Sequence, residues 1–169
     1  PLGHTTGGGD LFGATALAPG QLPLAETLVA LKSVLEDPAI LKIGQNMKYD
    51  WKIFARHGIR ITPFDDTLLM SYAMHAGIHN HGMDELSDRY LGYQPISIKT
   101  LLGSGKSQIT FDKVAIDDAV KYAAEDADVT LRLWQTFKHR LHRAKVPTVY
   151  ETLERPLVTV LADMEMAGI

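Results

Sequence analysis

The sequence predicts an α/β fold that is largely helical, with a small sheet flanked by helices. Two short apolar runs, residues 40–44 (ILKIG) and 59–64 (IRITPF), are typical of buried strands. The other regular segments repeat apolar residues every three or four positions, which is the period of a helix packed on one side. With 169 residues and 46% apolar residues, the chain is long enough to bury one core.

Composition narrows the class of protein. The formal net charge is -3, so the chain has no basic field, and any contact with nucleic acid would have to be local. The absence of cysteine excludes disulfides and thiolate metal sites, and it fits a reducing compartment. No apolar run reaches transmembrane length and no signal peptide is found, so we expect no membrane partner and a cytosolic location.

The N-terminal half is predicted to contain a loop and two helices. Residues 1–24 are rich in Gly, Thr and Pro and show neither periodicity, which indicates a long surface loop. A helix over residues 25–36 ends before a proline, because the residue ahead of proline disfavours helical backbone. After the first strand, Asn46 can cap a helix over residues 47–57.

Helices dominate the rest of the chain. Asp66 or Thr67 can begin a helix over residues 68–76. Residues 103–108 (GSGKSQ) are predicted to form a loop. Further helices are predicted over residues 83–91, 112–144 and 150–167, the last with Pro156 in its first turn.

The long helix carries three acids within one short stretch, Glu125, Asp126 and Asp128. At about 100° per residue, Glu125 and Asp128 project away from the apolar face, so we expect both to be solvated. Asp126 points at the margin of the core, one turn after Tyr122. The predicted apolar face comprises Ala119, Val120, Ala123, Ala127, Leu131, Trp134, Phe137 and Leu141.

A carboxylate in apolar surroundings needs a partner, because burying an unpaired charge is costly. A salt bridge or a helix cap would satisfy Asp126. Asp50, however, also points inward from its own helix, between Ile53 and Phe54. Two aspartates that met would repel unless a cation joined them, and Mg²⁺ takes carboxylate oxygens. The sequence pattern is consistent with a metal site, with a protonated pair of aspartates and with separate salt bridges.

Two segments carry a resemblance to a known family. KIGQNMKYD (residues 42–50) and KYAAEDADVT (residues 121–130) resemble the second and third exonuclease motifs of the bacterial DNA polymerase I family. Tyr122 followed by Asp126 matches the Tyr-x-x-x-Asp form of the DEDD exonucleases. The resemblance implies a partial 3′-to-5′ proofreading exonuclease domain over residues 1–149 and the start of a polymerase domain over residues 150–169.

The resemblance also implies a fold and a chemistry. The fold would be ribonuclease H-like, a mixed sheet with flanking helices, and phosphodiester bonds would be hydrolysed by two Mg²⁺ or Mn²⁺ ions held among four carboxylates. Asp50 and Asp126 match two of these catalytic, metal-binding carboxylates, and Tyr122 would orient the attacking water. Gln45, Asn46 and Tyr49 match the family residues that line the path of a single-stranded DNA 3′ end. The ring of Tyr49 could stack on a base.

One family motif has no match. The Asp-x-Glu of the first strand, which supplies the other two carboxylates, should lie ahead of residue 1. The Asp-x-Glu formed by Asp163 and Glu165 lies in the polymerase-like end, and we interpret it as unrelated. The family's early strands have no match either, so we expect an incomplete sheet with an exposed edge.

Three functions follow as hypotheses. The first is a metal-dependent proofreading exonuclease that acts on DNA 3′ ends in replication and repair, within a longer polymerase chain. The chain alone should then be inactive or nearly so, because two carboxylates cannot fix two catalytic metals. The alternative is an exonuclease-like scaffold domain that has lost catalysis. A stand-alone DEDD ribonuclease is disfavoured, because the last segment resembles a polymerase.

Other signals are set aside. GSGKS (residues 103–107) lacks the first glycine and the leading strand of a phosphate-binding loop. His75, His79 and His81 lie in a glycine-containing segment without a nearby acid or cysteine that completes a zinc site, so we predict a solvated loop. Lys48 is as consistent with a solvated helix face as with a phosphate contact.

Overall fold

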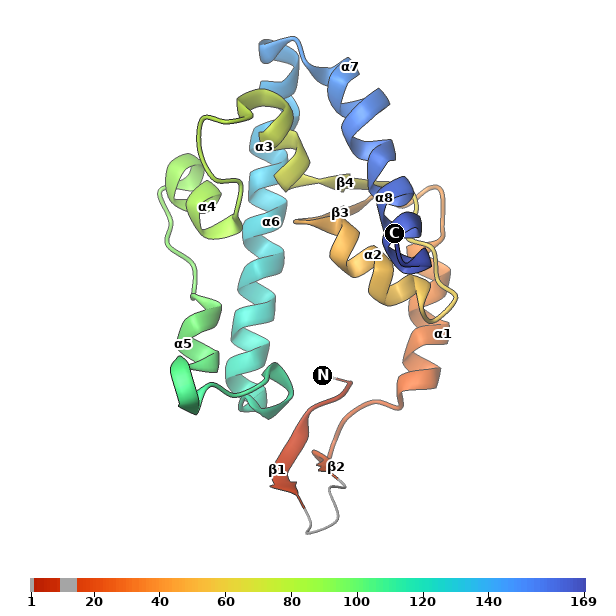
Figure 1. Ribbon diagram of the computed structural model, residues 1–169, viewed down its shortest axis with the longest axis vertical. Coiled ribbons are helices and arrows are strands. Elements are labelled where there is room, and N and C mark those ends of the chain that lie inside the picture. Colours follow the sequence, from red (N-terminus) through yellow and green to blue (C-terminus); the bar gives the residue numbers. More distant parts are fainter. Residues whose placement is uncertain (1, 10–14) are drawn as a thin grey trace.

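The computed structural model describes residues 2–9 and 15–169. The longest helix, α6 (Ile116–Ala144), runs along most of the long axis of the molecule (Figure 1). Helices α4 (Met83–Leu91) and α5 (Ile98–Leu102) lie on one side of it, and α1 (Leu24–Leu35) and α2 (Met47–Ala55) lie on the other. The predicted largely helical α/β fold is confirmed.

The N-terminal segment forms a hairpin where a loop was predicted. Strand β1 (Thr5–Gly9) pairs antiparallel with β2 (Thr15–Leu17), and Thr5 lies opposite Leu17. Gln21 fastens the open end, since its side chain bonds both the N–H and the C=O of His4, at 2.9 and 2.8 Å. This part of the prediction was wrong because glycine and threonine give no apolar alternation to reveal a strand. Residues 1 and 10–14 of the predicted loop lie outside the described residues.

The second sheet also has two described strands. Strand β3 (Lys42–Gly44) runs parallel to β4 (Phe64–Asp66), with Lys42 opposite Phe64 and Gly44 opposite Asp66. The second strand was predicted at residues 59–64, too early: Ile59 and Ile61 are buried, but the extended segment that carries them makes no ladder. Among the described strands only β4 pairs with β3, so the other edge of β3 is open, as expected of an incomplete sheet.

Asp66, at the end of β4, holds the start of two helices. Its carboxylate accepts hydrogen bonds from the N–H groups of Asn46 and Met47 at the start of α2, at 3.0 and 2.8 Å. It also accepts one from the N–H of Leu68 in α3 (Thr67–His75), at 2.9 Å. The predicted start of α3 is confirmed. The prediction that Asn46 caps α2 was wrong, because the Asp66 carboxylate already bonds the free N–H groups there.

The connection between α4 and α6 is more helical than predicted. Helix α4 has its predicted bounds, and Gly92 follows it with left-handed backbone, which glycine adopts without strain. Helix α5 was not predicted, and the predicted loop at residues 103–108 contains a short 3₁₀ turn, η1 (Gly105–Ser107). A second turn, η2 (Phe111–Lys113), precedes α6, which therefore begins four residues later than predicted.

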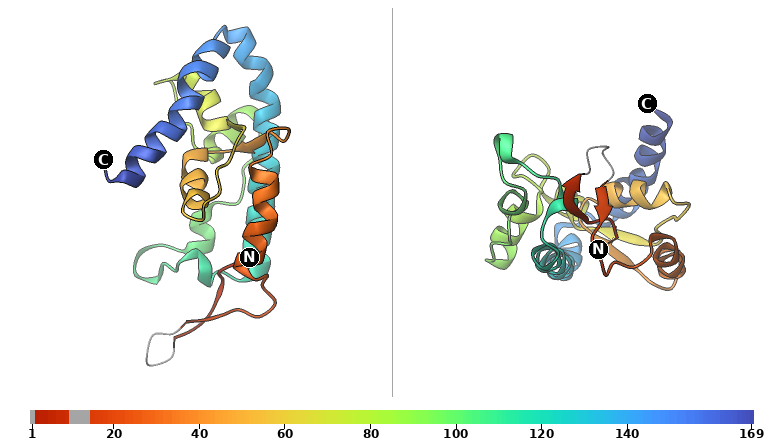
Figure 2. Two further views of the ribbon diagram at one scale, coloured as in Figure 1. Left: turned by 90° about the vertical axis from the view of Figure 1, so that its right-hand side faces the viewer. Right: turned by 90° about the horizontal axis from the view of Figure 1, so that it is seen from below.

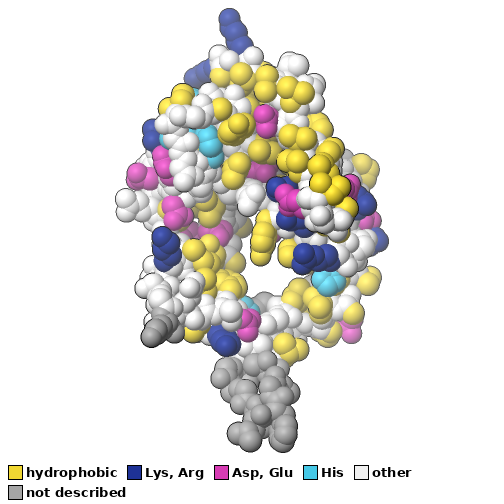
Figure 3. All heavy atoms as spheres, in the orientation of Figure 1, with side chains coloured by type: hydrophobic (Ala, Val, Ile, Leu, Met, Phe, Trp, Pro, Cys, Tyr) yellow, Lys and Arg dark blue, Asp and Glu magenta, His cyan; other side chains and the backbone are white. Residues whose placement is uncertain are grey.

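The apolar face predicted for α6 is only partly buried. Phe137 and Leu141 lie in a core with Val129, Leu133 and residues of α3 and α4. Val120 and Leu131, by contrast, are 52% and 43% exposed, and Ala123 and Ala127 are also exposed. Periodicity could not distinguish the buried residues of this face from the exposed ones, because it identifies an apolar stripe without showing which segments cover it. Figure 3 shows a hollow in this face of the molecule, between α6 and the pair α1 and α2 of Figure 1.

The C-terminal segment consists of three consecutive helical pieces rather than one helix, and the last of them packs onto α2. These are α7 (Pro147–Val149), a π-helical stretch η3 (Tyr150–Glu154) and α8 (Arg155–Ala167), with Pro156 in the first turn of α8 as predicted. Val158 and Ala162 of α8 are buried against Met47 and Trp51 of α2. In Figure 2, α8 leans away from the body, with the C-terminus at its outer end.

Ion pairs and a buried network fix this segment. Glu165 bonds both Lys48, at 2.5 Å, and Lys52 of α2. Asp65 accepts hydrogen bonds from the Tyr150 hydroxyl, the Arg155 guanidinium and the Trp134 indole, at 2.9, 2.9 and 2.8 Å. In the described part of the chain, no helix is long and apolar enough to cross a membrane.

We predict that Asp66→Ala lowers the free energy of unfolding by about 3 kcal/mol, because it leaves three N–H groups at buried helix ends without their acceptor. Urea denaturation of the chain measures this effect. Asp163→Ala is the matched control: Asp163 is 55% exposed and lies 3.8 Å from Arg60, so its loss should cost less than about 0.5 kcal/mol. Equal losses in the two variants would contradict the capping role.

Candidate functional site

Three of the predicted site residues are exposed at the first turn of α2. Tyr49 and Asp50 are neighbours in the helix, Asn46 directly precedes it, and Tyr49 is 63% exposed. Asn46 has left-handed backbone, with φ of 59°, which is uncommon outside glycine. Its amide makes no capping bond, because Asp66 has taken that role. The Asn46 side chain is therefore not used at the helix start.

Gln45, the third of the predicted substrate-binding residues, is hydrogen-bonded to other parts of the protein. Its amide donates to the backbone carbonyl of His81 at 2.8 Å, and its carbonyl accepts from the Thr67 hydroxyl. Gln45 thus ties the end of β3 to the segment between α3 and α4. This arrangement positions the start of α2 against that segment.

The prediction that Asp50 points inward was wrong, because the side of α2 that carries it is not covered by a described segment and Asp50 is exposed. The surrounding protein nevertheless raises the pKa of its carboxyl above the usual range. Removal from water is the larger cause, and a bond from its own backbone N–H works in the opposite direction. No described salt bridge reaches Asp50. Its charge is therefore available to a ligand.

Tyr122 and Asp126 lie one turn apart on α6, and each shifts the pKa of the other. Burial, followed by the Asp126 carboxylate, raises the pKa of the Tyr122 hydroxyl to about 12. Burial also raises the pKa of Asp126, while the Tyr122 hydroxyl lowers it. The Asp126 Oδ1 atom is buried and has no hydrogen-bond partner among the described residues. Asp126 therefore points inward, as predicted.

Asp50 and Asp126 do not pair with each other. Neither carboxylate is among the charges that shift the pKa of the other. No set of three His, Asp or Glu side chains in the described ranges, 2–9 and 15–169, is arranged to hold a metal ion. The structure thus brings Tyr122 and Asp126 together, and leaves Asp50 apart on α2.

Glu125, beside Asp126, is not solvated as predicted. Its carboxylate accepts a hydrogen bond from the Tyr93 hydroxyl and another from the N–H of Ile96, the latter at 2.6 Å. It therefore fastens the segment between α4 and α5 onto α6. Helical periodicity gives the direction of Glu125 but cannot show that a distant segment covers that side. Asp128 is exposed as predicted, with an Arg132 contact at 2.9 Å.

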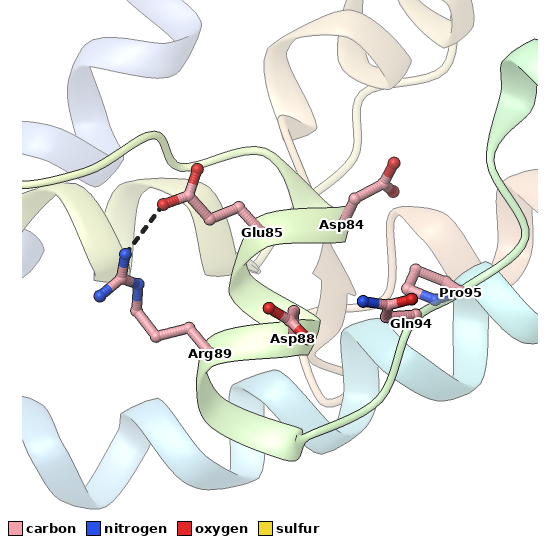
Figure 4. A pocket seen from close by; sticks show the side chains of 6 residues that line it. All are labelled: Asp84, Glu85, Asp88, Arg89, Gln94 and Pro95. Carbon is pink, nitrogen blue, oxygen red and sulfur yellow. Dashed lines mark hydrogen bonds and ion pairs between the residues drawn. The ribbon is translucent and has the colours of Figure 1, made fainter.

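Sequence reasoning missed a second acid near Asp126. The negative charge of Asp84 raises the pKa of both Tyr122 and Asp126, so Asp84 lies close to them. In Figure 4, Asp84 lines an open groove of about 720 Å³ and points away from the paired Glu85 and Arg89. An acid in the first turn of a helix is commonly explained by the helix dipole. The position of Asp84 in the sequence therefore did not indicate that it lies near Tyr122 and Asp126.

The three histidines set aside in the sequence form a cluster rather than a solvated loop. The His79 ring lies 5.5 Å from His75 and 4.9 Å from His81, between ring centroids. The His79 and Tyr90 side chains are hydrogen-bonded at 3.2 Å, as are those of His81 and Ser71 at 2.9 Å. The glycines of the segment indicated a solvated loop, but the three rings pack against one another and against Tyr90 and Tyr72.

A divalent cation fits the Asp126 side of the site better than the histidine cluster. Mg²⁺ is usually bound through one or two carboxylates with waters or phosphate oxygens completing its shell. The buried, unpartnered Oδ1 of Asp126 is an oxygen of this kind. Asp50 supplies an exposed carboxylate on α2, apart from Asp126.

Comparison with known proteins identifies related sequences. The sequence model of a family described as 3′-5′ exonuclease matches residues 13–142. The DNA polymerase I of Rhizobium leguminosarum is 54% identical over 169 residues, which are 100% of this chain and 16% of that protein. The DNA polymerase I of Pseudomonas aeruginosa is 43% identical over 154 residues, which are 89% of this chain and 17% of that protein. The chain therefore spans about a sixth of the length of these relatives.

Solved structures share the fold at lower identity. NrnC from Brucella melitensis matches with a TM-score of 0.67 and 18% identity, over 82% of this chain and 64% of that one. The POL domain of Pol1 from M. smegmatis, in complex with DNA primer-template and dNTP, matches with a TM-score of 0.69 and 22% identity, over 93% and 24%. At these identities the likeness supports the fold alone.

We predict that the histidine cluster makes stability depend on pH. Burial, and then the neighbouring His79, lower the pKa values of His75 and His81 below the usual value of about 6.5. Folding therefore favours the neutral rings, so this contribution is present above about pH 6.5 and is lost as the pH falls through the lowered values. Urea midpoints measured between pH 8 and pH 5 should fall. The fall should be smaller in a His75→Gln and His81→Gln double variant, and an equal fall in that variant would contradict the prediction.

Proposed function

The chain belongs to the 3′-5′ exonuclease family of DNA polymerase I, and on that basis we propose that it forms the proofreading exonuclease domain of such a polymerase. Its substrate would be the single-stranded 3′ end of DNA, from which it hydrolyses terminal nucleotides in replication and repair. The observation that carries this proposal is the Asp126 Oδ1 atom, buried without a partner beside the Tyr122 hydroxyl. A buried carboxylate oxygen without a partner is unfavourable unless a ligand satisfies it.

We assign metal binding to Asp50 and Asp126. A bound Mg²⁺ or Mn²⁺ would make water a better nucleophile and stabilise charge on the phosphate. The raised pKa values of both carboxyls reflect their removal from water, and a cation would favour their charged forms. Asp84, which lies near Asp126, adds negative charge that would also attract a cation.

Tyr122 would orient the attacking water as a neutral phenol. With a pKa of about 12, its hydroxyl keeps its proton at physiological pH and can donate a hydrogen bond. Its hydroxyl is near enough to the Asp126 carboxylate for each group to shift the pKa of the other. The same raised pKa disfavours a role for Tyr122 as a base at neutral pH.

The DNA strand would pass over the exposed face of α2. Tyr49 offers a ring that is 63% exposed and could stack a base of any sequence. The amide of Asn46, which makes no capping bond at the start of α2, is also exposed. Gln45 would act indirectly, since its amide is bonded to the His81 carbonyl and the Thr67 hydroxyl.

The remaining carboxylates would come from a segment ahead of residue 1 in a longer chain. The open edge of β3 and the exposed apolar residues of α6 support an added strand in the hollow of Figure 3. Glu165 does not substitute for the missing Asp-x-Glu, because Lys48 and Lys52 hold its carboxylate. We further propose that residues 150–169 begin the polymerase domain and that the whole protein works in the bacterial cytosol.

Digestion of a 5′-labelled single strand by the polymerase-length protein tests this function. With Mg²⁺ or Mn²⁺, we expect a ladder that shortens from the 3′ end. Asp126→Asn should slow the reaction by at least about 10²-fold, and Tyr122→Phe by about 10-fold or more, because they remove a metal ligand and the water-orienting hydroxyl. Asp128→Asn, two residues along α6 and exposed, is the matched control and should leave the rate unchanged.

The outcomes separate the candidate functions. The 169-residue chain alone should release no nucleotides, and release that Asp126→Asn abolishes would show that it completes its own site. If the polymerase-length protein released none with either metal, the exonuclease would be excluded in favour of the scaffold domain.

A further inference from the structure

The ring of Phe111, outside the proposed site residues, lies against Tyr122. Phe111 belongs to the turn η2 just before α6, and the centroids of the two rings are 5.9 Å apart, with their planes at 60°. Among the described residues, Phe111 is the aromatic side chain that packs against Tyr122. The Tyr122 ring thus has α6 behind it and Phe111 beside it.

The N-terminal hairpin holds Phe111 from its other side. The buried His4 ring packs edge-on against Phe111, with centroids 5.7 Å apart and planes at 69°. The neighbouring Thr5 hydroxyl donates to the Asp112 carboxylate at 2.9 Å. These contacts join residues more than 100 positions apart, so the turn that carries Phe111 is braced by a separate element (Figure 2).

The contacts among the rings of His4, Phe111 and Tyr122 matter because a phenol that orients water must keep its hydroxyl in place. A tyrosine side chain turns about two torsions, and a small rotation near the backbone moves the distant hydroxyl most. Misplacement of a catalytic group by about 1 Å can cost as much as 10²-fold in rate. Contact with a second ring limits that rotation.

We propose that Phe111, braced by His4 and Thr5 of the hairpin, is a positioning residue that fixes the Tyr122 hydroxyl for hydrolysis. The inference rests on the proposed exonuclease function and deepens it. Phe111 acts through Tyr122 and has no contact of its own with the reacting phosphate. A different role, in which Phe111 stacks a base of the DNA strand, would act on substrate binding instead.

A double-mutant cycle in the polymerase-length protein tests the proposal. Phe111→Leu removes the ring contact, so we expect kcat on single-stranded DNA to fall by about 5- to 10-fold with KM unchanged. In a Tyr122→Phe background the same change should have no further effect, because no hydroxyl remains to be positioned. Phe111→Tyr keeps the ring and should restore kcat.

A matched control separates positioning from general damage. Ile109 lies two residues earlier and is 39% exposed, close to the 36% of Phe111, so Ile109→Ala removes apolar area from the same segment. Its kcat should stay within about twofold of the wild type. Three results would each overturn the proposal: an unchanged kcat in Phe111→Leu, an equal fall in both backgrounds, or a rise in KM in place of the fall in kcat.

The ring signals of Tyr122 give a readout that does not need activity. Proton NMR with labelled tyrosine should show these signals shifted in Phe111→Leu and unchanged in Ile109→Ala. If the wild type released no nucleotides, the proposed function would fail by itself. Unshifted Tyr122 signals in Phe111→Leu would contradict the ring contact whatever the activity.

Discussion

The carboxylate of Asp66 fixes the geometry on which one side of the candidate site depends. It is 1% exposed, and burying a charge is costly, so burial raises its pKa. Three hydrogen bonds from N–H groups at the start of α2 and α3 offset that cost, and the dipoles of both helices favour a negative charge there. One side chain at the end of β4 thus sets where α2 begins and which way it runs.

The position of α2 has a chemical consequence. Because Asp66 bonds the free N–H groups, the Asn46 side chain is not needed as a cap at the start of α2. Asn46 also has left-handed backbone. Non-glycine residues in that conformation are often found at functional positions. The same helix then presents Tyr49 and Asp50 on its open face, while Glu165 holds its opposite side through Lys48 and Lys52.

The other side of the candidate site, Tyr122 and Asp126, lies on α6 and does not depend on Asp66. The core beneath α6 places Asp126 at its margin, and Glu125 fastens the segment after α4 alongside. Nothing described between α6 and α2 pairs Asp126 with Asp50, and Figure 3 shows the hollow between these elements. The two halves of the candidate site are therefore separate in this structure.

The sequence predicted those parts of the structure that depend on local pattern. Helices α3 and α4 and the inward direction of Asp126 followed from caps, glycines and the 100° turn per residue. Contacts between distant segments could not be predicted in this way. The bonds of Glu125 to Tyr93 and Ile96, and the capping of α2 by Asp66, join residues 19 to 32 positions apart. Periodicity likewise could not show that Val120 and Leu131 would stay uncovered.

The most direct measurement is the binding of Mn²⁺, followed by electron paramagnetic resonance of the free ion in the presence of the polymerase-length protein. A cation at the unpartnered oxygen of Asp126 predicts that the wild type and Asp128→Asn remove free Mn²⁺ from solution alike, while Asp126→Asn loses that binding. Equal Mn²⁺ binding by Asp126→Asn and the wild type would contradict a metal site at Asp126.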